Sequence, residues 1–201
     1  VIDGIKYSLR DDGVLIVQFM YAGTMIEKLN FDTIYHEHLC YYTMRSLNNL
    51  LRPYGLEIFD AYYSEIHRGS IISKITHIDG AVNIKTQRFL DLLEKDKKYT
   101  YEAFKDFATT IEAHRTDLKT VLEAYKKENK TIYAYGAPAK GNTLLNYFGI
   151  DNNLVDKAVE INELKIGTYL PQSHIPITLE DKSDLPDYYL LLSHNFATEI
   201  I

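Results

Sequence analysis

The sequence has one cysteine, Cys40, no tryptophan, and no long apolar run among its 201 residues. A single cysteine excludes an intrachain disulfide and a zinc site built from several cysteines, and it fits a reducing compartment. No apolar stretch approaches the roughly 18 residues of a membrane-spanning helix. The first residues, VIDGIKYSLRDDG, do not resemble a signal peptide. We therefore expect a cytoplasmic protein without a membrane segment.

The charge balance is acidic, with 28 Asp and Glu against 22 Lys and Arg, for a net charge of −6. This balance argues against a broad surface for nucleic acid or for anionic membranes. The hydrophobic fraction of 46% and the charged fraction of 25% are typical of a globular protein. The length allows one large domain or two small ones.

The first third of the chain alternates strand and helix signals. After a helix end and a turn at Asp12–Gly13, residues 14–19 form an apolar run that predicts a buried strand. Ser46 is a plausible N-cap for a short helix that Pro53 ends. Residues 56–63 and 71–78 predict two more strands. Together these elements resemble the tail of an α/β sheet.

Residues 84–128 are charged and predict helix. From Phe104 to Tyr125, apolar residues recur at the i, i+3, i+4, i+7 spacing of an amphipathic helix, and Thr100 is a reasonable N-cap. The mixed charges of this stretch indicate a solvated face rather than a binding site.

From Lys130 onward the pattern changes to short β-rich runs. TIYAYG, VDKAVEI and DYYLLLS each predict a strand, with HIPI as a shorter extended piece. A glycine-punctuated loop after the first run leads into a helix that begins near Ala139 or Gly141. Strand–helix–strand order at this spacing predicts a small parallel sheet of the half-Rossmann kind.

The loop YGAPAKGNT places Gly136, Lys140 and Gly141 between a strand and a helix. Backbone N–H groups at a helix start, together with the Lys140 ammonium group, suit a phosphate. The spacing matches neither the P-loop nor the G-x-G-x-x-G dinucleotide fingerprint. An equally simple interpretation is that the glycines only permit a tight turn.

The segment FDTIYHEHLCYY, residues 31–42, concentrates ionisable and aromatic side chains. On a strand, His36 and His38 would share a face, as metal ligands often do. With Glu37 or Asp32 they would mimic an iron site of two histidines and one carboxylate. However, Glu37 would then point away, and no separate third ligand is evident.

The same segment also supports acid–base chemistry or simple packing. On an irregular turn, Tyr35, Glu37 and His38 form a set in which histidine is a natural base near neutral pH and a carboxylate orients it. Packing explains Phe31 and Leu39 but not three ionisable groups among them. The residues alone leave both interpretations open.

Five motifs in order, FDTIYHEHLCYY, HRGS, YGAPAKGNTLLNYFGI, GTYLPQSHIPI and SHNFATEII, make the chain from Gly13 onward similar to the sugar C-methyltransferase family. That family acts on nucleotide-linked deoxy-sugars with S-adenosylmethionine. Its members contain a zinc-binding module, a class I methyltransferase domain and a Rossmann-like C-terminal domain.

The resemblance implies an α/β fold in two parts. Residues 1–66 correspond to the end of the methyltransferase domain. Residues 67–201 correspond to the nucleotide-sugar-binding Rossmann-like domain, with a helical linker at 84–128. The glycine-rich S-adenosylmethionine loop and the zinc cysteines are expected upstream of Val1. This chain is thus expected to be a fragment that is inactive by itself and does not hold its own methyl donor.

The resemblance also implies roles for individual residues. His38 would remove a proton from a carbon next to a ketone, Tyr35 would orient the sugar or stabilise the enolate, and Glu37 would position His38. No metal ligand is implied in this chain. The implied substrate contacts are Lys140, Gly141, Asn142, Gly136, Ser70 and Asn195.

Two departures from the family pattern stand out. The family usually has His-Gly-Gly-Ser, where this chain has Arg68 after the histidine. His194 stands where the family often carries a tryptophan that would stack on a nucleotide base. These departures keep open the alternative of a non-catalytic nucleotide-sugar-binding module. The histidine pair keeps open a metal-dependent oxidoreductase.

Overall fold

The computed structural model describes residues 1–64, 66, 69–82, 84–194 and 197–200, which divide into two compact units. Unit 1 comprises Val1–Asn30 and Leu39–Phe107, and unit 2 comprises Phe31–His38 and Ala108–Ile201. The short segment Phe31–His38 thus packs with unit 2, although the chain on both sides of it belongs to unit 1. The predicted domain boundary between residues 66 and 67 stays a prediction.

Unit 1 contains a three-stranded antiparallel sheet in the order β1-β3-β2, formed by β1 (Leu15–Met20), β2 (Leu56–Ser64) and β3 (Ser70–His77). Gly69, directly before β3, has a φ of +131°, and a Cβ there would lie 2.4 Å from the side chain of Thr24. The glycine of the HRGS motif is therefore required by the backbone and by its neighbour. All three strands were predicted from sequence, and the structure confirms them. The prediction that the first is buried is wrong, because β1 lies at the edge of the sheet and none of its residues is buried.

Helices pack against this sheet. They are α1 (Ile2–Ser8), α2 (Ala22–Glu27), α3 (Met44–Leu51) with the 3-10 turn Arg52–Tyr54, and α4 (Gln87–Lys95). The core combines side chains from both layers: Tyr21, Met44, Leu47, Leu51, Leu56, Ile58, Ala61, Ile71, Ile75, Phe89 and Leu92. Burial of these apolar surfaces is the main stabilising contribution to unit 1.

The prediction that Ser46 caps α3 is wrong by one turn. Thr43 is the N-cap, and its hydroxyl oxygen accepts the backbone N–H of Ser46 at 3.2 Å. The Ser46 hydroxyl in turn accepts the backbone N–H of Thr43 at 2.9 Å. This reciprocal pair is a capping box in which serine takes the third helical position, so both hydroxyl residues satisfy N–H groups at the helix start.

The predicted helical stretch 84–128 is divided in two. After α4 a 3-10 turn spans Asp96–Lys98, and α5 runs from Tyr101 to Lys127. The buried Asp96 carboxylate accepts the hydroxyl of Tyr21 and, at 2.7 Å, the backbone N–H of Arg45, which ties the break to unit 1. Thr100 caps α5 as predicted, because its hydroxyl accepts the N–H of Ala103.

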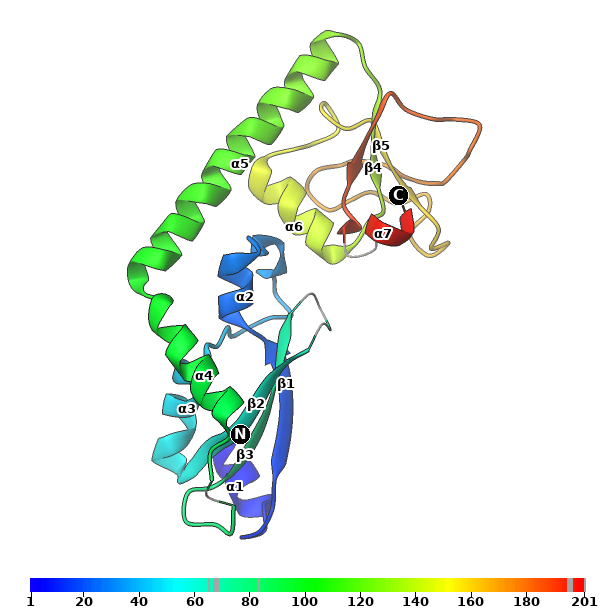
Figure 1. Cartoon of the computed structure of the whole chain (residues 1–201). Helices are drawn as coiled ribbons and strands as arrows, with labels where there is room; N and C mark the ends of the chain where they lie inside the picture. The colour runs from blue at the N-terminus through cyan, green and yellow to red at the C-terminus, as the bar shows by residue number, and fades with distance from the viewer. Residues whose placement is uncertain (65, 67–68, 83, 195–196, 201) are drawn as a thin grey trace. The chain divides into compact units, whose positions relative to one another are not determined.

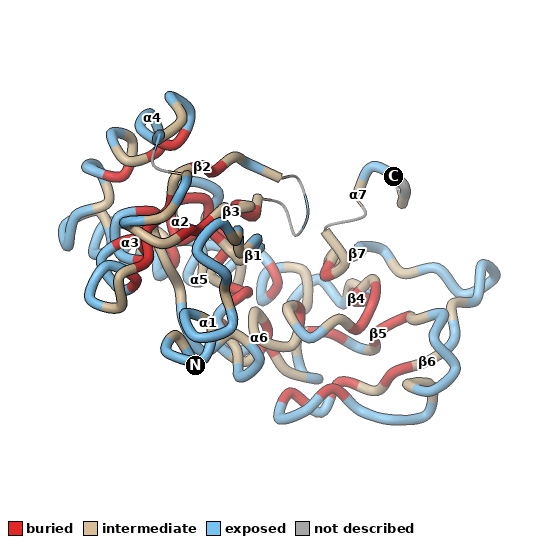
Figure 2. The backbone as a smooth tube through the Cα atoms, turned by 90° about the horizontal axis from the view of Figure 1, so that it is seen from below, coloured by how far each residue is buried: buried red, intermediate tan, exposed pale blue. Residues whose placement is uncertain are grey.

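Unit 2 is built on a four-stranded parallel sheet in the order β6-β5-β4-β7. Its strands are β4 (Ile132–Tyr135), β5 (Lys157–Glu160), β6 (Ile177–Leu179) and β7 (Tyr188–Leu191). The central strands β4 and β5 are the most buried (Figure 2). The parallel sheet confirms the predicted Rossmann-like α/β fold.

Unit 2 also contains three helical elements besides the part of α5 that belongs to it: η1 (Phe31–Thr33), α6 (Ala139–Phe148) and α7 (Ala197–Ile200). α6 follows β4 and lies beside the sheet (Figure 1). The helix can approach Leu192, which follows β7, because Gly141 has no side chain: a Cβ at this position would lie only 2.8 Å from the Cβ of Leu192. Among the described residues, no helix combines the length and apolarity needed to cross a membrane.

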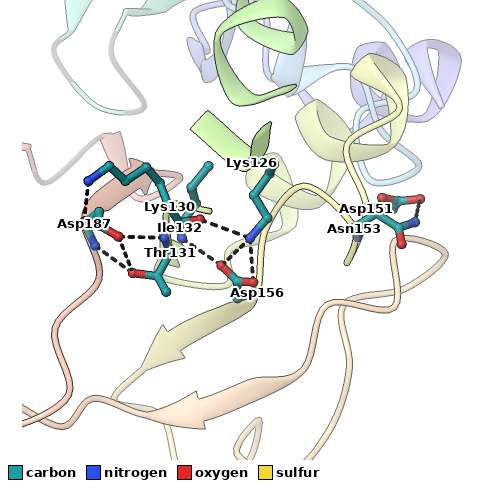
Figure 3. A network of polar contacts seen from close by, with 8 residues as sticks. All are labelled: Lys126, Lys130, Thr131, Ile132, Asp151, Asn153, Asp156 and Asp187. Carbon is teal, nitrogen blue, oxygen red and sulfur yellow. Dashed lines mark hydrogen bonds and ion pairs between the residues drawn. The ribbon is translucent and has the colours of Figure 1, made fainter. Parts of the chain in front are cut away.

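The amino ends of the parallel strands are held by carboxylates (Figure 3). Asp156 accepts the backbone N–H of Ile132 at 2.8 Å and also the ammonium group of Lys126, near the end of α5. Asp187 accepts the backbone N–H of Thr131 at 2.8 Å. These contacts fasten α5, β4 and the segments before β5 and β7 to one another.

Candidate functional site

Tyr35 and His38 are the first and last residues of a tight turn. The backbone N–H of His38 donates to the carbonyl of Tyr35 at 2.9 Å, and the two ring centroids are 4.6 Å apart. The first and last residues of such a turn are necessarily close, which explains why the side chains of Tyr35 and His38 are in contact. The turn is the conformation that the acid–base interpretation expects, whereas the metal interpretation requires a strand.

The His38 ring is oriented by a backbone carbonyl. Its Nδ1 lies 2.7 Å from the carbonyl oxygen of Thr33, which can only accept a hydrogen bond. Nδ1 of a neutral ring therefore carries the hydrogen, and the basic lone pair is on Nε2. This is the tautomer in which Nε2 can take up a proton.

Tyr35 is kept in its protonated form by its surroundings. Burial raises the pKa of its hydroxyl, and the negative charge of Glu37, a hydrogen bond to Glu37 and the charge of Asp32 raise it further. The Tyr35 hydroxyl is therefore a hydrogen-bond donor throughout the neutral range. Glu37 itself is exposed at the corner of the turn.

A hollow of about 380 Å³ lies between this turn and the start of α6. Tyr35 lines it from the turn, Pro138 and Asn142 from the helix start, and Lys165 from the loop after β5. The side-chain oxygen of Asn142 is buried and has no hydrogen-bond partner among the described residues. Pro138 at the N-cap supplies no side-chain cap, so the first N–H groups of α6 have no partner within the helix.

A second hollow of about 340 Å³ lies at the carboxyl ends of the parallel strands. Gly136, Glu160 and Ser193, which follow or end β4, β5 and β7, line it. β4 is the strand at which the sheet order reverses, and ligands of open α/β sheets bind at such a point. Gly136 has a φ of +83°, and a Cβ there would lie 1.9 Å from the Ser193 hydroxyl, so only glycine fits.

Glu160 gives the second hollow a negative charge. Burial by itself would raise the pKa of this carboxyl, but hydrogen bonds from the backbone N–H groups of Asn162, Ala137 and Ile161 outweigh burial and lower it. Glu180 also lines the hollow and accepts the hydroxyl of Tyr135 at 3.1 Å. Two carboxylates suit hydroxyl groups of a ligand and oppose a phosphate at that place.

The residues predicted to bind substrate fall in different places. Gly136 lines the second hollow, and Lys140, Gly141 and Asn142 form the first turn of α6, all in the unit that holds Tyr35, Glu37 and His38. Ser70 belongs to unit 1, is 1% exposed, and donates its hydroxyl hydrogen to the Ile66 carbonyl at 2.8 Å. Asn195 lies outside the described residues, as do His67 and Arg68.

Sequence reasoning missed the contributions of Thr33 and Lys165. Thr33 orients His38 through its backbone carbonyl. Because every residue has this group, the residue type at position 33 could not have indicated the contact. The Lys165 ammonium group donates to the Ala137 carbonyl at 2.9 Å and thereby braces the loop before α6. Only the neighbouring GTYLPQSHIPI motif, which contains the hollow-lining Tyr169, indicated that this region matters.

The described residues contain no group of three or more His, Cys, Asp or Glu side chains placed to hold a metal ion. His36 is exposed at the corner of the turn and lines the first hollow beside Tyr35. The turn thus brings together an imidazole, a phenol and an exposed carboxylate, those of His38, Tyr35 and Glu37.

Two comparisons with known proteins bear on this site. A family profile described as the C-methyltransferase C-terminal domain matches residues 65–201. The C-methyltransferase NovU of Streptomyces niveus is 31% identical over 205 aligned residues, which cover 100% of this chain and 49% of NovU. The chain spans about half the length of this curated relative.

Proposed function

Because the chain belongs to the C-methyltransferase family, we propose that it serves an S-adenosylmethionine-dependent C-methyltransferase acting on a nucleotide-linked keto-deoxy-sugar. In this proposal the chain binds the sugar nucleotide and activates the carbon to be methylated. The observation that carries the proposal is the Tyr35–His38 turn, in which an oriented imidazole and a protonated phenol lie side by side, and the phenol ring of Tyr35 lines a hollow.

The chemistry follows from the proton that must be removed. Nε2 of His38 takes a proton from the carbon next to the ketone, and the electrons of the broken C–H bond form an enolate. The Tyr35 hydroxyl donates a hydrogen bond to the developing enolate oxygen. S-adenosylmethionine, when bound in the complete enzyme, would supply an electrophilic methyl group: the enolate carbon would form the new C–C bond as the methyl–sulfur bond breaks and S-adenosylhomocysteine leaves. Before substrate binds, the Tyr35 hydroxyl donates its one hydrogen to Glu37; in the enolate complex the same hydrogen turns to the enolate oxygen, and the charge of Glu37 keeps the phenol protonated.

The glycine at the start of α2 leaves no space for the methyl donor. Gly23 stands where β1 passes into α2, the kind of junction at which a glycine-rich loop holds a nucleotide. A Cβ at Gly23 would lie 2.4 Å from the ring of Tyr21 and 2.6 Å from that of Tyr99, so protein side chains fill this space. We therefore assign donor binding to none of these residues and route no step of the mechanism through them.

The two hollows suggest how a sugar nucleotide lies on unit 2. The diphosphate suits the start of α6, where the first N–H groups have no partner within the helix and Lys140 in the first turn adds a positive charge to this part of the chain. The nucleoside, with its hydroxyl groups, suits the acidic second hollow beside Gly136. The keto-sugar then extends toward Tyr35 in the first hollow. The zinc module that the resemblance implies and the cytoplasmic location that the single cysteine favours stay predictions.

Calorimetric titration of this chain with thymidine diphosphate, and separately with S-adenosylhomocysteine, tests the binding part of the proposal. We expect the nucleotide to bind and the cofactor product not to bind. Lys140→Ala should weaken nucleotide binding, because it removes the cation at the start of α6. Lys105→Ala on the exposed face of α5 is the matched control. If wild type and Lys140→Ala bound thymidine diphosphate with equal affinity, the proposed diphosphate site at α6 would be wrong. Binding of S-adenosylhomocysteine would contradict the expectation that this chain does not hold the methyl donor.

The alternative function is a nucleotide-sugar-binding module without chemistry. An active enzyme that contains this chain should exchange the hydrogen next to the ketone of its sugar nucleotide with deuterium from solvent. A binding module would not, because the exchange requires a base. Mass spectrometry of the recovered sugar nucleotide measures the exchange.

A further inference from the structure

Two side chains from distant parts of the sequence meet in unit 2, close to the catalytic turn. Asp32 in η1 is 4% exposed, and its Oδ2 lies 3.3 Å from Nε2 of His194. His194 follows β7 and so stands at the carboxyl edge of the parallel sheet. The pair connects the segment that carries the base with the edge that carries the hollows.

The surroundings of His194 favour its charged form. Its Nδ1 lies 3.2 Å from the carbonyl oxygen of Leu192, so both ring nitrogens face oxygen atoms. A neutral imidazole would turn a lone pair toward one of these oxygens, whereas the imidazolium ion has a hydrogen on each nitrogen. A carboxylate as buried as Asp32 also requires a compensating charge.

The contact between the two side chains is an ion pair rather than an aligned hydrogen bond. Oδ2 of Asp32 is buried, and it has no hydrogen-bond partner among the described residues. The attraction therefore depends on the charge of His194. The Tyr35 hydroxyl also lies within electrostatic reach of Asp32, and it stays neutral because its pKa is raised.

Asp32 is covalently next to the group that orients the base. On one side of Asp32, the carbonyl oxygen of Thr33 accepts a hydrogen bond from Nδ1 of His38 at 2.7 Å. On the other side, the ring of Phe31 stacks on Phe148 with centroids 5.0 Å apart. The segment is thus fixed to α6 by an apolar contact and to the sheet edge by a charged one. A shift of Asp32 would move the Thr33 carbonyl and rotate the base.

We propose that the Asp32–His194 ion pair holds the Phe31–His38 segment on the carboxyl edge of the sheet, so that Nε2 of His38 points at the substrate carbon. Asp32 and His194 are positioning residues, because they act on the reaction through His38. This inference rests on the proposed function, in which His38 is the base.

The charge state of the pair can be measured on this chain without any activity. In nitrogen-15 side-chain spectra at neutral pH, His194 should show the imidazolium pattern in the wild type and a neutral pattern in Asp32→Asn. A neutral His194 in the wild type would overturn the proposal. So would an imidazolium signal that persists in Asp32→Asn, because the charge would then not depend on Asp32.

The positioning role is tested in an active enzyme that contains this chain. Asp32→Asn and His194→Leu should each lower kcat by about 10- to 100-fold with KM unchanged, since a base misplaced by roughly 1 Å costs about that much. The double variant should be no slower than either single variant, because both remove one interaction. His194→Lys keeps a positive charge and should recover part of the rate, whereas His194→Gln keeps only an N–H donor and should be as slow as His194→Leu.

Asp184→Asn is the matched control, since Asp184 pairs with Lys157 at the protein surface away from the turn. Its kcat should equal that of the wild type. An unchanged kcat in Asp32→Asn and His194→Leu, with His38→Asn inactive, would overturn the positioning role alone. An active His38→Asn would overturn the base and the positioning role together. Should Asp32→Asn not fold, His194→Leu, whose side chain is 27% exposed in the wild type, tests the same contact.

Discussion

The two ends of the parallel sheet in unit 2 use polar groups in opposite ways. At the amino ends, the carboxylates of Asp156 and Asp187 accept backbone N–H groups and lysine ammonium groups, so that little polar capacity remains unused. At the carboxyl ends, a hollow of about 340 Å³ lies beside Gly136 and Ser193. One end of the sheet holds the strands together, and the other borders the hollow in which we propose that the nucleoside binds.

Aromatic side chains show the same division. Near the amino ends, the ring of Tyr125 at the end of α5 stacks on Tyr188 at the start of β7, with centroids 3.9 Å apart and planes at 3°. On the side of the hollows, Tyr35 lies against His38 and directs its hydroxyl to Glu37. A substitution at the amino ends should therefore change stability, and one at the carboxyl ends should change function.

The largest effect is expected at the base itself. His38→Asn in an active enzyme containing this chain should lower kcat by about 10²- to 10⁴-fold, because general-base catalysis contributes on that order. Binding of the sugar nucleotide should remain close to that of the wild type. Steady-state kinetics and calorimetry measure the two quantities.

His174→Asn is a suitable control for His38→Asn. His174 is exposed and has a φ of +55°, a conformation that asparagine tolerates. Equal losses of kcat in both variants, or wild-type turnover in His38→Asn, would contradict the assignment of the base.

A smaller effect is expected from filling the carboxyl edge. Gly136→Ala combines a positive φ with a clash against Ser193, and we expect it to destabilise unit 2 by about 2–4 kcal/mol. It should also abolish nucleotide binding, because the second hollow changes shape. Gly167→Ala separates the two causes, since Gly167 has a similar φ of +78° but open space around its Cα. Equal denaturation midpoints for the two variants would show that the clash with Ser193 does not matter.

The smallest effect is expected at the amino edge, in the pH dependence of stability. The backbone N–H and hydroxyl of Thr131, followed by the Lys130 ammonium group, lower the pKa of Asp187 below its ordinary value of 3.8. A carboxylate with a lowered folded-state pKa stabilises the protein above the ordinary pKa and loses that contribution as pH falls through the folded-state value.

Asp187→Asn should therefore lower stability at neutral pH and flatten its decline below about pH 4, where the wild-type contribution is lost. The effect is small because Asp187 is exposed. Denaturation midpoints measured from neutral to acidic pH, with the exposed α5 residue Asp117→Asn as control, test this expectation. An acid decline as steep in Asp187→Asn as in the wild type would show that Asp187 carries none of it.

The sequence by itself determined the local elements and the residues with chemical potential. The strands of both units, the cap of α5 at Thr100 and the start of α6 near Ala139 follow from local periodicity and from caps. The Tyr35–His38 segment stood out because ionisable side chains among aromatics are rarely explained by packing. These signals are readable because each depends on residues within a few positions of one another.

Only the tertiary structure decided which segments meet. It places Phe31–His38 with the parallel sheet rather than with its sequence neighbours, breaks the long helical stretch at the buried Asp96, and pairs Asp32 with His194. In the folded chain, a backbone carbonyl, that of Thr33, orients the His38 ring. Contacts between residues more than a hundred positions apart, and contacts made by groups common to every residue, leave no local pattern in the sequence. Packing and the satisfaction of buried polar groups select them only when the chain folds.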